Sequence, residues 1–167
     1  GNINGAGLVT GSTIDLNAVS GIGDTTQLEL AGTALTADTT NGNIDIDNAN
    51  AATATYTTVT TGTGSITVDN SGGGAVVFTA VTTTDGAVDL EATGGNLTVG
   101  TAVTAGGSNN ASLTTTTSGN VVLTGTTTAA GDQVMVTSAG SINGAGLVTG
   151  LTIDLNAVSG IGDTTQL

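Results

Sequence analysis

The sequence predicts an all-β protein folded as a parallel β-solenoid, with three short strands in each coil of about 22 residues. The first observation is a motif of glycine, any residue, and two branched apolar residues flanking one polar position. This motif begins at Gly42, Gly64 and Gly86, and so recurs at a constant 22-residue step. The second observation is that apolar and polar residues alternate, as in strands with one buried face, and that no segment has a helical stripe. Equivalent strands at a fixed step imply stacked, parallel coils.

Three sets of apolar positions share this step, and each set predicts one strand of the coil. The first set lies in the glycine motif, the second contains Val59, Val81 and Val103, and the third contains Ala54 and Tyr56. The equivalents of the third set in the next two coils are Val76, Phe78, Leu97 and Val99. The usual hand of parallel crossovers predicts right-handed coiling. An immunoglobulin-like sandwich is the competing fold, but one Phe, one Tyr and no Trp supply little of the aromatic core that it needs.

A long duplication is the third observation. Residues 1–28 recur at 140–167 with two differences, Asn2/Ser141 and Ser12/Leu151. We therefore predict one tandem repeat unit over residues 1–139, the start of the next unit over 140–167, and a single continuous solenoid. A unit of about six coils would rise about 30 Å at roughly 4.8 Å per coil. Both copies should then share one conformation, so that repetition lengthens the rod without changing its cross-section.

The charge of the chain excludes several kinds of function. Thirteen acidic residues give a formal net charge of −13, and there is no Lys, Arg, His or Cys. Nucleic-acid binding needs cationic side chains to displace counterions, so it is excluded. Binding to anionic membranes is disfavoured for the same reason, and no apolar run is long enough for membrane insertion. Without Lys or Arg, trypsin-like proteases have no cleavage site.

A column of acidic residues is the most specific polar feature. Asp47, Asp69 and Glu91 recur at 22-residue steps, each directly after a predicted strand. Like charges at this spacing repel by roughly 3 kcal/mol at an effective dielectric near 20, and the chain has no cation to offset them. Ca²⁺ could bridge the carboxylates, with Asn48 and Asn70 as further oxygen ligands. The alternative is a solvated turn beside a short asparagine ladder.

Threonine-rich faces suggest a second binding hypothesis. Regular Thr-x-Thr rows on a flat solenoid face could bind ice. Thr60, Thr82 and Thr104 stack at the 22-residue step, but the partner column reads Thr58, Ala80 and Ala102. The plainer interpretation is that Thr suits outward strand positions.

The residue types do not favour an enzyme. Solenoid enzymes that cleave polysaccharides combine acids with Arg, Lys or His, which are absent here. Tyr56 and Phe78 are the only aromatic residues, and no long insertion predicts a cleft. We therefore predict no catalytic residue and no cofactor, apart from Ca²⁺ if the acid column binds it.

The Gly-x-Ile/Val-x-Ile/Val/Leu motifs, joined by Thr, Asn and Gly turns, resemble the repeat regions of filamentous-haemagglutinin-like exoproteins and giant bacterial β-strand-repeat adhesins. The resemblance covers essentially the whole chain and implies a secreted or surface-anchored β-helix that acts as a spacer or adhesive fibre. It implies an extracellular or cell-surface location and bacterial-type secretion. The expected partners are other copies joined end to end, or further repeats in a longer chain, with cell surfaces or glycans as binding targets.

Overall fold

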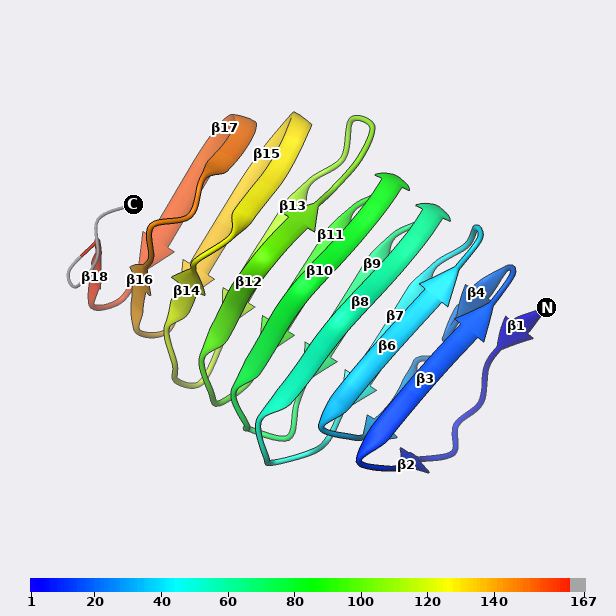
Figure 1. Ribbon diagram of the computed structural model, residues 1–167. Coiled ribbons are helices and arrows are strands. Elements are labelled where there is room, and N and C mark those ends of the chain that lie inside the picture. The colour runs from blue at the N-terminus through cyan, green and yellow to red at the C-terminus, as the bar shows by residue number, and fades with distance from the viewer. Residues whose placement is uncertain (163–167) are drawn as a thin grey trace.

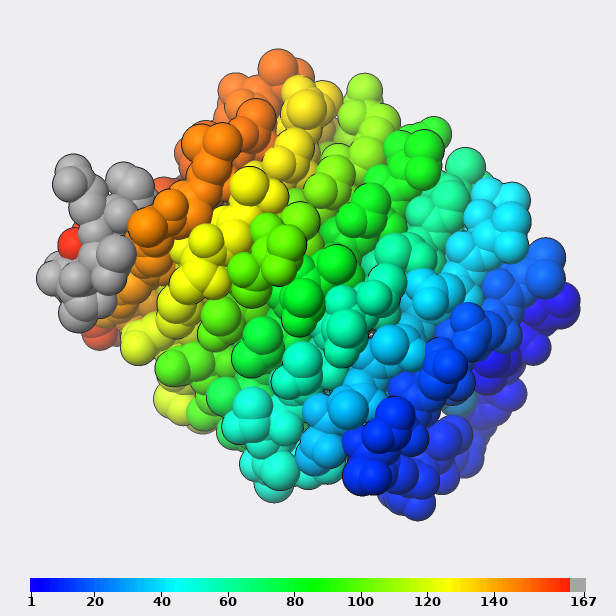
Figure 2. Space-filling view, viewed as in Figure 1, coloured from blue at the N-terminus to red at the C-terminus, as the bar shows by residue number. Residues whose placement is uncertain are grey.

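The protein is a stack of parallel β-coils. A computed structural model describes residues 1–162, which form eighteen strands in one continuous hydrogen-bonded sheet and no helix. The chain winds through about 7 turns, and strands one turn apart lie side by side along the stack (Figure 1). Successive turns show as adjacent bands across the surface (Figure 2). The predicted all-β parallel solenoid is confirmed.

The strands follow one another with only short connections. In chain order they are β1 (Asn2–Ile3), β2 (Val9–Thr10), β3 (Thr13–Ala18), β4 (Gly21–Ile22), β5 (Leu28–Ala31), β6 (Ala34–Thr39), β7 (Ile44–Asn48), β8 (Ala54–Thr63), β9 (Ile66–Asn70), β10 (Val76–Asp85), β11 (Val88–Ala92), β12 (Leu97–Thr104), β13 (Ala111–Thr115), β14 (Val121–Leu123), β15 (Thr126–Ser138), β16 (Ser141–Asn143), β17 (Val148–Ala157) and β18 (Gly160–Ile161).

Each central turn has three sides. Side one consists of residues 44–48, 66–70, 88–92 and 111–115, which pair in register from Ile44 to Ile66, Val88 and Ala111. Side two consists of residues 54–56, 76–78, 97–99 and 121–123. Side three consists of residues 58–61, 80–83, 102–105 and 126–129.

Sides two and three are continuous in the middle of the stack. The strands β8 and β10 run through both sides, and the register skips one residue between Phe78 and Ala80. Thr57 and Thr58 both face outward at the equivalent place, so the inward–outward alternation breaks there and the strand turns the corner. The three predicted apolar stretches per coil are therefore present, although two of them belong to one long, bent strand.

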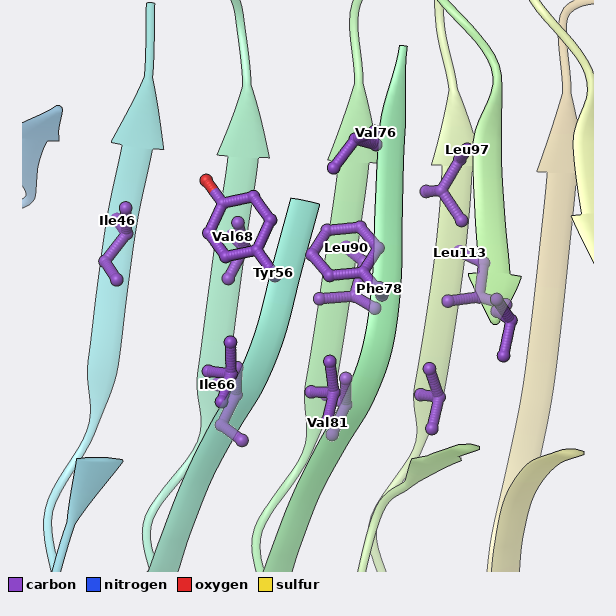
Figure 3. Packing of buried hydrophobic residues seen from close by; sticks show 14 of the residues in the cluster. Ile46, Tyr56, Ile66, Val68, Val76, Phe78, Val81, Leu90, Leu97 and Leu113 are labelled. Carbon is purple, nitrogen blue, oxygen red and sulfur yellow. The ribbon is translucent and has the colours of Figure 1, made fainter. Parts of the chain in front are cut away.

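The core is a column of branched and aromatic side chains along the axis of the stack. Inward positions on all three sides are fully buried, and Tyr56 stacks on Phe78 with ring centroids 5.0 Å apart (Figure 3). Val68 and Leu90 are stacked in the same way from one turn to the next. Each large side chain in this column contributes roughly 1.5–3 kcal/mol by its burial.

Polar side chains also enter the core, at the corners. Asn48 is fully buried, and its amide donates to the Gly32 carbonyl at 3.1 Å and accepts from the Gly32 N–H at 3.1 Å. Buried hydroxyls play a similar part elsewhere, since Thr61 donates to the Gly42 carbonyl at 2.9 Å and Thr83 donates to the Gly64 carbonyl at 2.9 Å. These bonds satisfy backbone groups where the chain leaves one side and starts the next. The three apolar sets predicted from the sequence did not include these polar residues.

Glycine is required where the chain turns into side one. Gly42 has a φ of 101°, and a Cβ on it would lie 1.4 Å from the carbonyl oxygen of Ser20 in the turn below. Gly64, one turn later, has a φ of 138° and meets the backbone of Gly42 in the same way. A side chain at either position would clash with the neighbouring coil, which explains why the strand motif begins with glycine.

The two copies of the duplicated segment do not occupy equivalent places. Their local pairing agrees, because Asn2 pairs with Gly21 as Ser141 pairs with Gly160. However, Ile14 stacks on Leu35, whereas its copy Ile153 stacks on Val134 of side one. The first copy also forms two strands, β2 and β3, where the second forms the single strand β17. The expectation that both copies share one conformation is therefore wrong; residues 163–167 of the second copy lie outside the described residues.

The asparagine corners yield a stability prediction. Asn48→Ala removes two hydrogen bonds, so that the buried N–H and C=O of Gly32 lose the Asn48 side chain as their partner. We expect this change to lower the free energy of unfolding by about 1–3 kcal/mol. Asn70→Ala should cost less, because Asn70 makes one bond, to Gly74, and its Oδ1 is buried without a partner. Urea unfolding of both variants measures the difference. Equal costs would contradict this account of the corners.

Candidate functional site

Residues 1–162 enclose no pocket. Within that range, no three His, Cys, Asp or Glu side chains come together in a way that could hold a metal ion. The described part of the chain also contains no helix with the length and hydropathy needed to traverse a lipid bilayer. The candidate functional features are therefore the outer surfaces of the sides.

The outer surface of side one carries an acidic ridge. Asp47 pairs with Asp69 and Asp69 with Glu91, so the three predicted residues lie in one column, one per turn. The structure adds Glu29, which pairs with Asp47 at the start of the column. We use the name acidic ridge for these four residues, Glu29, Asp47, Asp69 and Glu91. The column then changes to Thr114 in the next turn, which ends the run of charge.

Two carboxylates of the acidic ridge, those of Asp47 and Asp69, accept hydrogen bonds from different donors. Asp47 accepts from the Ser71 hydroxyl at 2.7 Å and from the Ser71 N–H at 3.2 Å. Asp69 accepts instead from the Gln27 side chain at 3.0 Å, and the same Gln27 nitrogen donates to Asp45 at 2.9 Å. Neutral donors thus partly replace the missing cations, because hydrogen bonds to a charged acceptor are stronger than neutral ones.

Asp69 lies in an unfavourable environment for a charge. Burial raises the pKa of its carboxyl above the ordinary value of 3.8, although the bond from Gln27 lowers it. The charges of Asp47, Asp89 and Asp45 raise this pKa further. Beneath the ridge, burial also raises the pKa of the Tyr56 hydroxyl far above its usual range, and the charge of Asp47 adds to that rise. The Asn48 side chain lowers the Tyr56 pKa, yet the Tyr56 hydroxyl has no hydrogen-bond partner of good geometry.

A second set of acids lies beside the ridge at a wider spacing. Asp45 pairs with Thr67, and Thr67 pairs with Asp89, so the two carboxylates are two turns apart. At about 10 Å, this separation equals one Debye length at 0.1 M salt. The intervening threonine therefore keeps a second continuous row of charge from forming.

The calcium hypothesis receives mixed evidence. The predicted stacking of Asp47, Asp69 and Glu91 is confirmed, but Asn48 and Asn70 are not part of the same surface. Both asparagines are fully buried and bind the backbone of Gly32 and Gly74 inside the coil. Their proposed role as calcium ligands is wrong, because residues that follow one another in a strand face opposite ways. Calcium binding by the carboxylates alone stays a prediction.

The threonine rows lie on side three, as the 22-residue step predicts. Thr60, Thr82 and Thr104 form one outward column, and Thr58, Ala80 and Ala102 form the next. The first column also includes Asp38, which accepts a hydrogen bond from Thr60. A charged residue and two alanines interrupt the regular double row of hydroxyls, and ice binding stays a prediction.

Sequence reasoning missed Glu29 and Gln27. Gln27 ends, and Glu29 follows, a loop at residues 23–27 that inserts extra residues between β4 and β5, which together pair with β7. The step from Glu29 to Asp47 is therefore shorter than the steps that follow it, and the search at 22-residue steps passed over Glu29. The apolar pair Leu28 and Leu30 around Glu29 was the signal that could have identified this strand.

The raised pKa of Asp69 predicts a pH effect. Between 3.8 and the raised value, the folded protein holds a proton on Asp69 that the unfolded chain releases, so stability falls as pH rises through this window. We expect Asp69→Asn to be more stable than the wild type at pH 7 and equal to it near pH 3. Thermal melting across this pH range measures the difference, with Asp132→Asn, outside the ridge, as the control. An Asp69→Asn variant that is less stable at pH 7 would contradict the prediction.

Comparison with known proteins gives no match: no family model, no curated protein and no solved structure is similar to this chain. The fold is therefore assigned from the register of the strands, and the resemblance to filamentous-haemagglutinin-like proteins and giant adhesins stays a prediction.

Proposed function

We propose that this chain is part of a structural rod, an extracellular fibre or adhesin stalk built from tandem β-solenoid repeats, and that its role is mechanical rather than enzymatic. The proposal is supported by a continuous stack of strands, by the absence of a pocket in residues 1–162, and by the recurrence of the opening segment 1–28 at 140–167. In such a rod every coil is a template for the next one.

The observation that carries the proposal is the unbroken parallel pairing of each turn with the next. Residues at one position of side one pair in succession from Ile22 through Ile44, Ile66 and Val88 to Ala111. Ile14 and Ile22 are 6% and 0% exposed, because later turns of the same unit cover them. Each turn is thus buried by the turn stacked on it, so that adding repeats extends the column without a new kind of contact.

Surface chemistry supports a soluble, extended fibre. The sides carry Thr, Asn and Asp, and the formal net charge of −13 has no positive charge against it. Rods of this charge repel one another sideways. We propose that the partners are further repeats of the same kind, joined end to end or within a longer chain, with cell surfaces or glycans as the targets of the fibre. We propose an extracellular or cell-surface location and a bacterial-type secretion route.

The rod proposal is tested by lengthening the chain. Appending a further copy of residues 29–167 to the full chain adds one 139-residue unit in tandem. We expect the longest dimension in small-angle X-ray scattering to grow by about 30 Å per added unit, at about 4.8 Å per coil, while the cross-sectional radius stays the same. A matched chain in which the appended copy carries Ile44→Asp, Ile66→Asp and Val88→Asp in its core is the control and should not extend the rod. Added units that fold as separate globules, or an increase in the cross-sectional radius, would contradict the proposal.

A further inference from the structure

The repeat unit does not contain a whole number of turns. The column that starts at Ile3 on side one passes through Ile22, Ile44, Ile66, Val88 and Ala111 to Val134. Each step is the number of residues along the chain from one member of the column to the next. The first of the six steps is the shortest, the next three are equal, and the last two are each one residue longer than those three. The copy of Ile3 is Ile142, which lies eight residues beyond Val134 and pairs with Val121 on side two. One unit therefore makes six turns and roughly a third of another.

Two further segments of the second copy show the same displacement. The segment 15–18 lies on side three, where Asp15 pairs with Thr36 and Thr36 with Thr58. Its copy 154–157 lies on side one, where Asp154 pairs with Met135. Ile22 belongs to side one through Ile44, and its copy Ile161 belongs to side two through Ile142. Ile3, segment 15–18 and Ile22 are thus displaced by one side in the second copy. Val9 on side one has its copy Val148 on side three, because the second copy passes its corners at other residues.

We infer that each repeat unit is rotated by about one side relative to the unit before it, so that the acidic ridge moves to the next side in every unit and returns to its first side after three units. This inference rests on the proposed function, because it needs the stack to continue from one unit into the next. The ridge of one unit occupies side one, and the same four residues in the following unit occupy side two.

The rotation changes what a partner meets along the fibre. On side one, the column of Asp45, Asp89 and Asp154 continues into the threonine-bearing strands of the next unit, because Asp154 is the copy of Asp15 and Asp15 pairs with Thr36. Acidic and threonine-rich surfaces therefore alternate along each side. An acidic ridge recurs on any one side only once in three units, about 90 Å at about 4.8 Å per turn. A flat cationic surface can contact one ridge in three, whereas a flexible cationic chain can wind around the rod and follow all of them.

Cysteine pairs test the rotation, since the chain has no cysteine of its own. Met135→Cys with Asp154→Cys joins neighbours in the observed register. Adjacent strands place such residues within the Cα separation of 4.4–6.8 Å that a disulfide accepts. Thr126→Cys with Asp154→Cys is the matched alternative, because Thr126 stands in the column of Asp15 and would neighbour Asp154 if both copies lay on the same side.

A third cysteine pair in the lengthened chain separates this inference from the rod proposal. It joins Asp154→Cys to the copy of Thr36 in the added unit, also changed to cysteine. Mild oxidation, followed by gel mobility and mass spectrometry, should show disulfides in more than tenfold excess for the first and third pairs over the Thr126 pair. A disulfide in the Thr126 pair in place of the first pair would overturn the rotation and leave the rod intact. A disulfide in the first pair with none in the third would show that the stack does not continue, and would overturn both the rod and its rotation.

Discussion

Everything in this structure depends on hydrogen bonding between the backbones of successive coils. Strands within the stack pair in parallel with the strands one turn before and after them, so any change in the length of a turn must be absorbed at a corner or in a loop. The loop at residues 23–27 shows this. Ile22 pairs with Ile44 and Leu28 pairs with Ile46, although Leu28 is six positions after Ile22 and Ile46 is only two positions after Ile44. The backbone ladder fixes the register, and side-chain order follows from it.

That register also forces like charges together. Residues at equivalent positions must stack, so an acid that recurs at the period of the coil lies next to itself in every turn. The chain tolerates this without a cation in three ways: Asp47 and Asp69 accept hydrogen bonds from different donors, Thr67 separates Asp45 from Asp89, and the pKa of Asp69 rises. The remaining repulsion between coils is small beside the buried apolar column and the ladder, each of which gains with every turn.

The sequence predicted what is periodic and missed what is not. The parallel solenoid, its three inward stretches and the stacked acids all follow from a 22-residue step that is strict between residues 42 and 90. Glu29 was missed because an insertion shifts it out of step. The buried roles of Asn48 and Thr61 were missed because polar residues are ordinarily placed outside, and only the position of the corner shows that they complete the hydrogen bonds of buried backbone groups. Right-handed coiling stays a prediction.

The 139-residue repeat unit does not contain a whole number of turns of the coil, and this mismatch has the widest structural consequence. A repeat of six whole turns would place identical surfaces on the same side of the rod, and each side would carry one kind of chemistry along its whole length. Because six turns counted from Ile3 end at Val134, before the copy of Ile3 is reached, the second copy begins on another side. The duplicated segment fits both places because its alternating apolar residues can face inward on any side of a coil: Ile14 stacks on Leu35, and Ile153 stacks on Val134. The alternating pattern of this segment determines which face of the strand points inward. It does not determine which side of the rod the strand occupies, because that depends on the number of residues in the preceding turns.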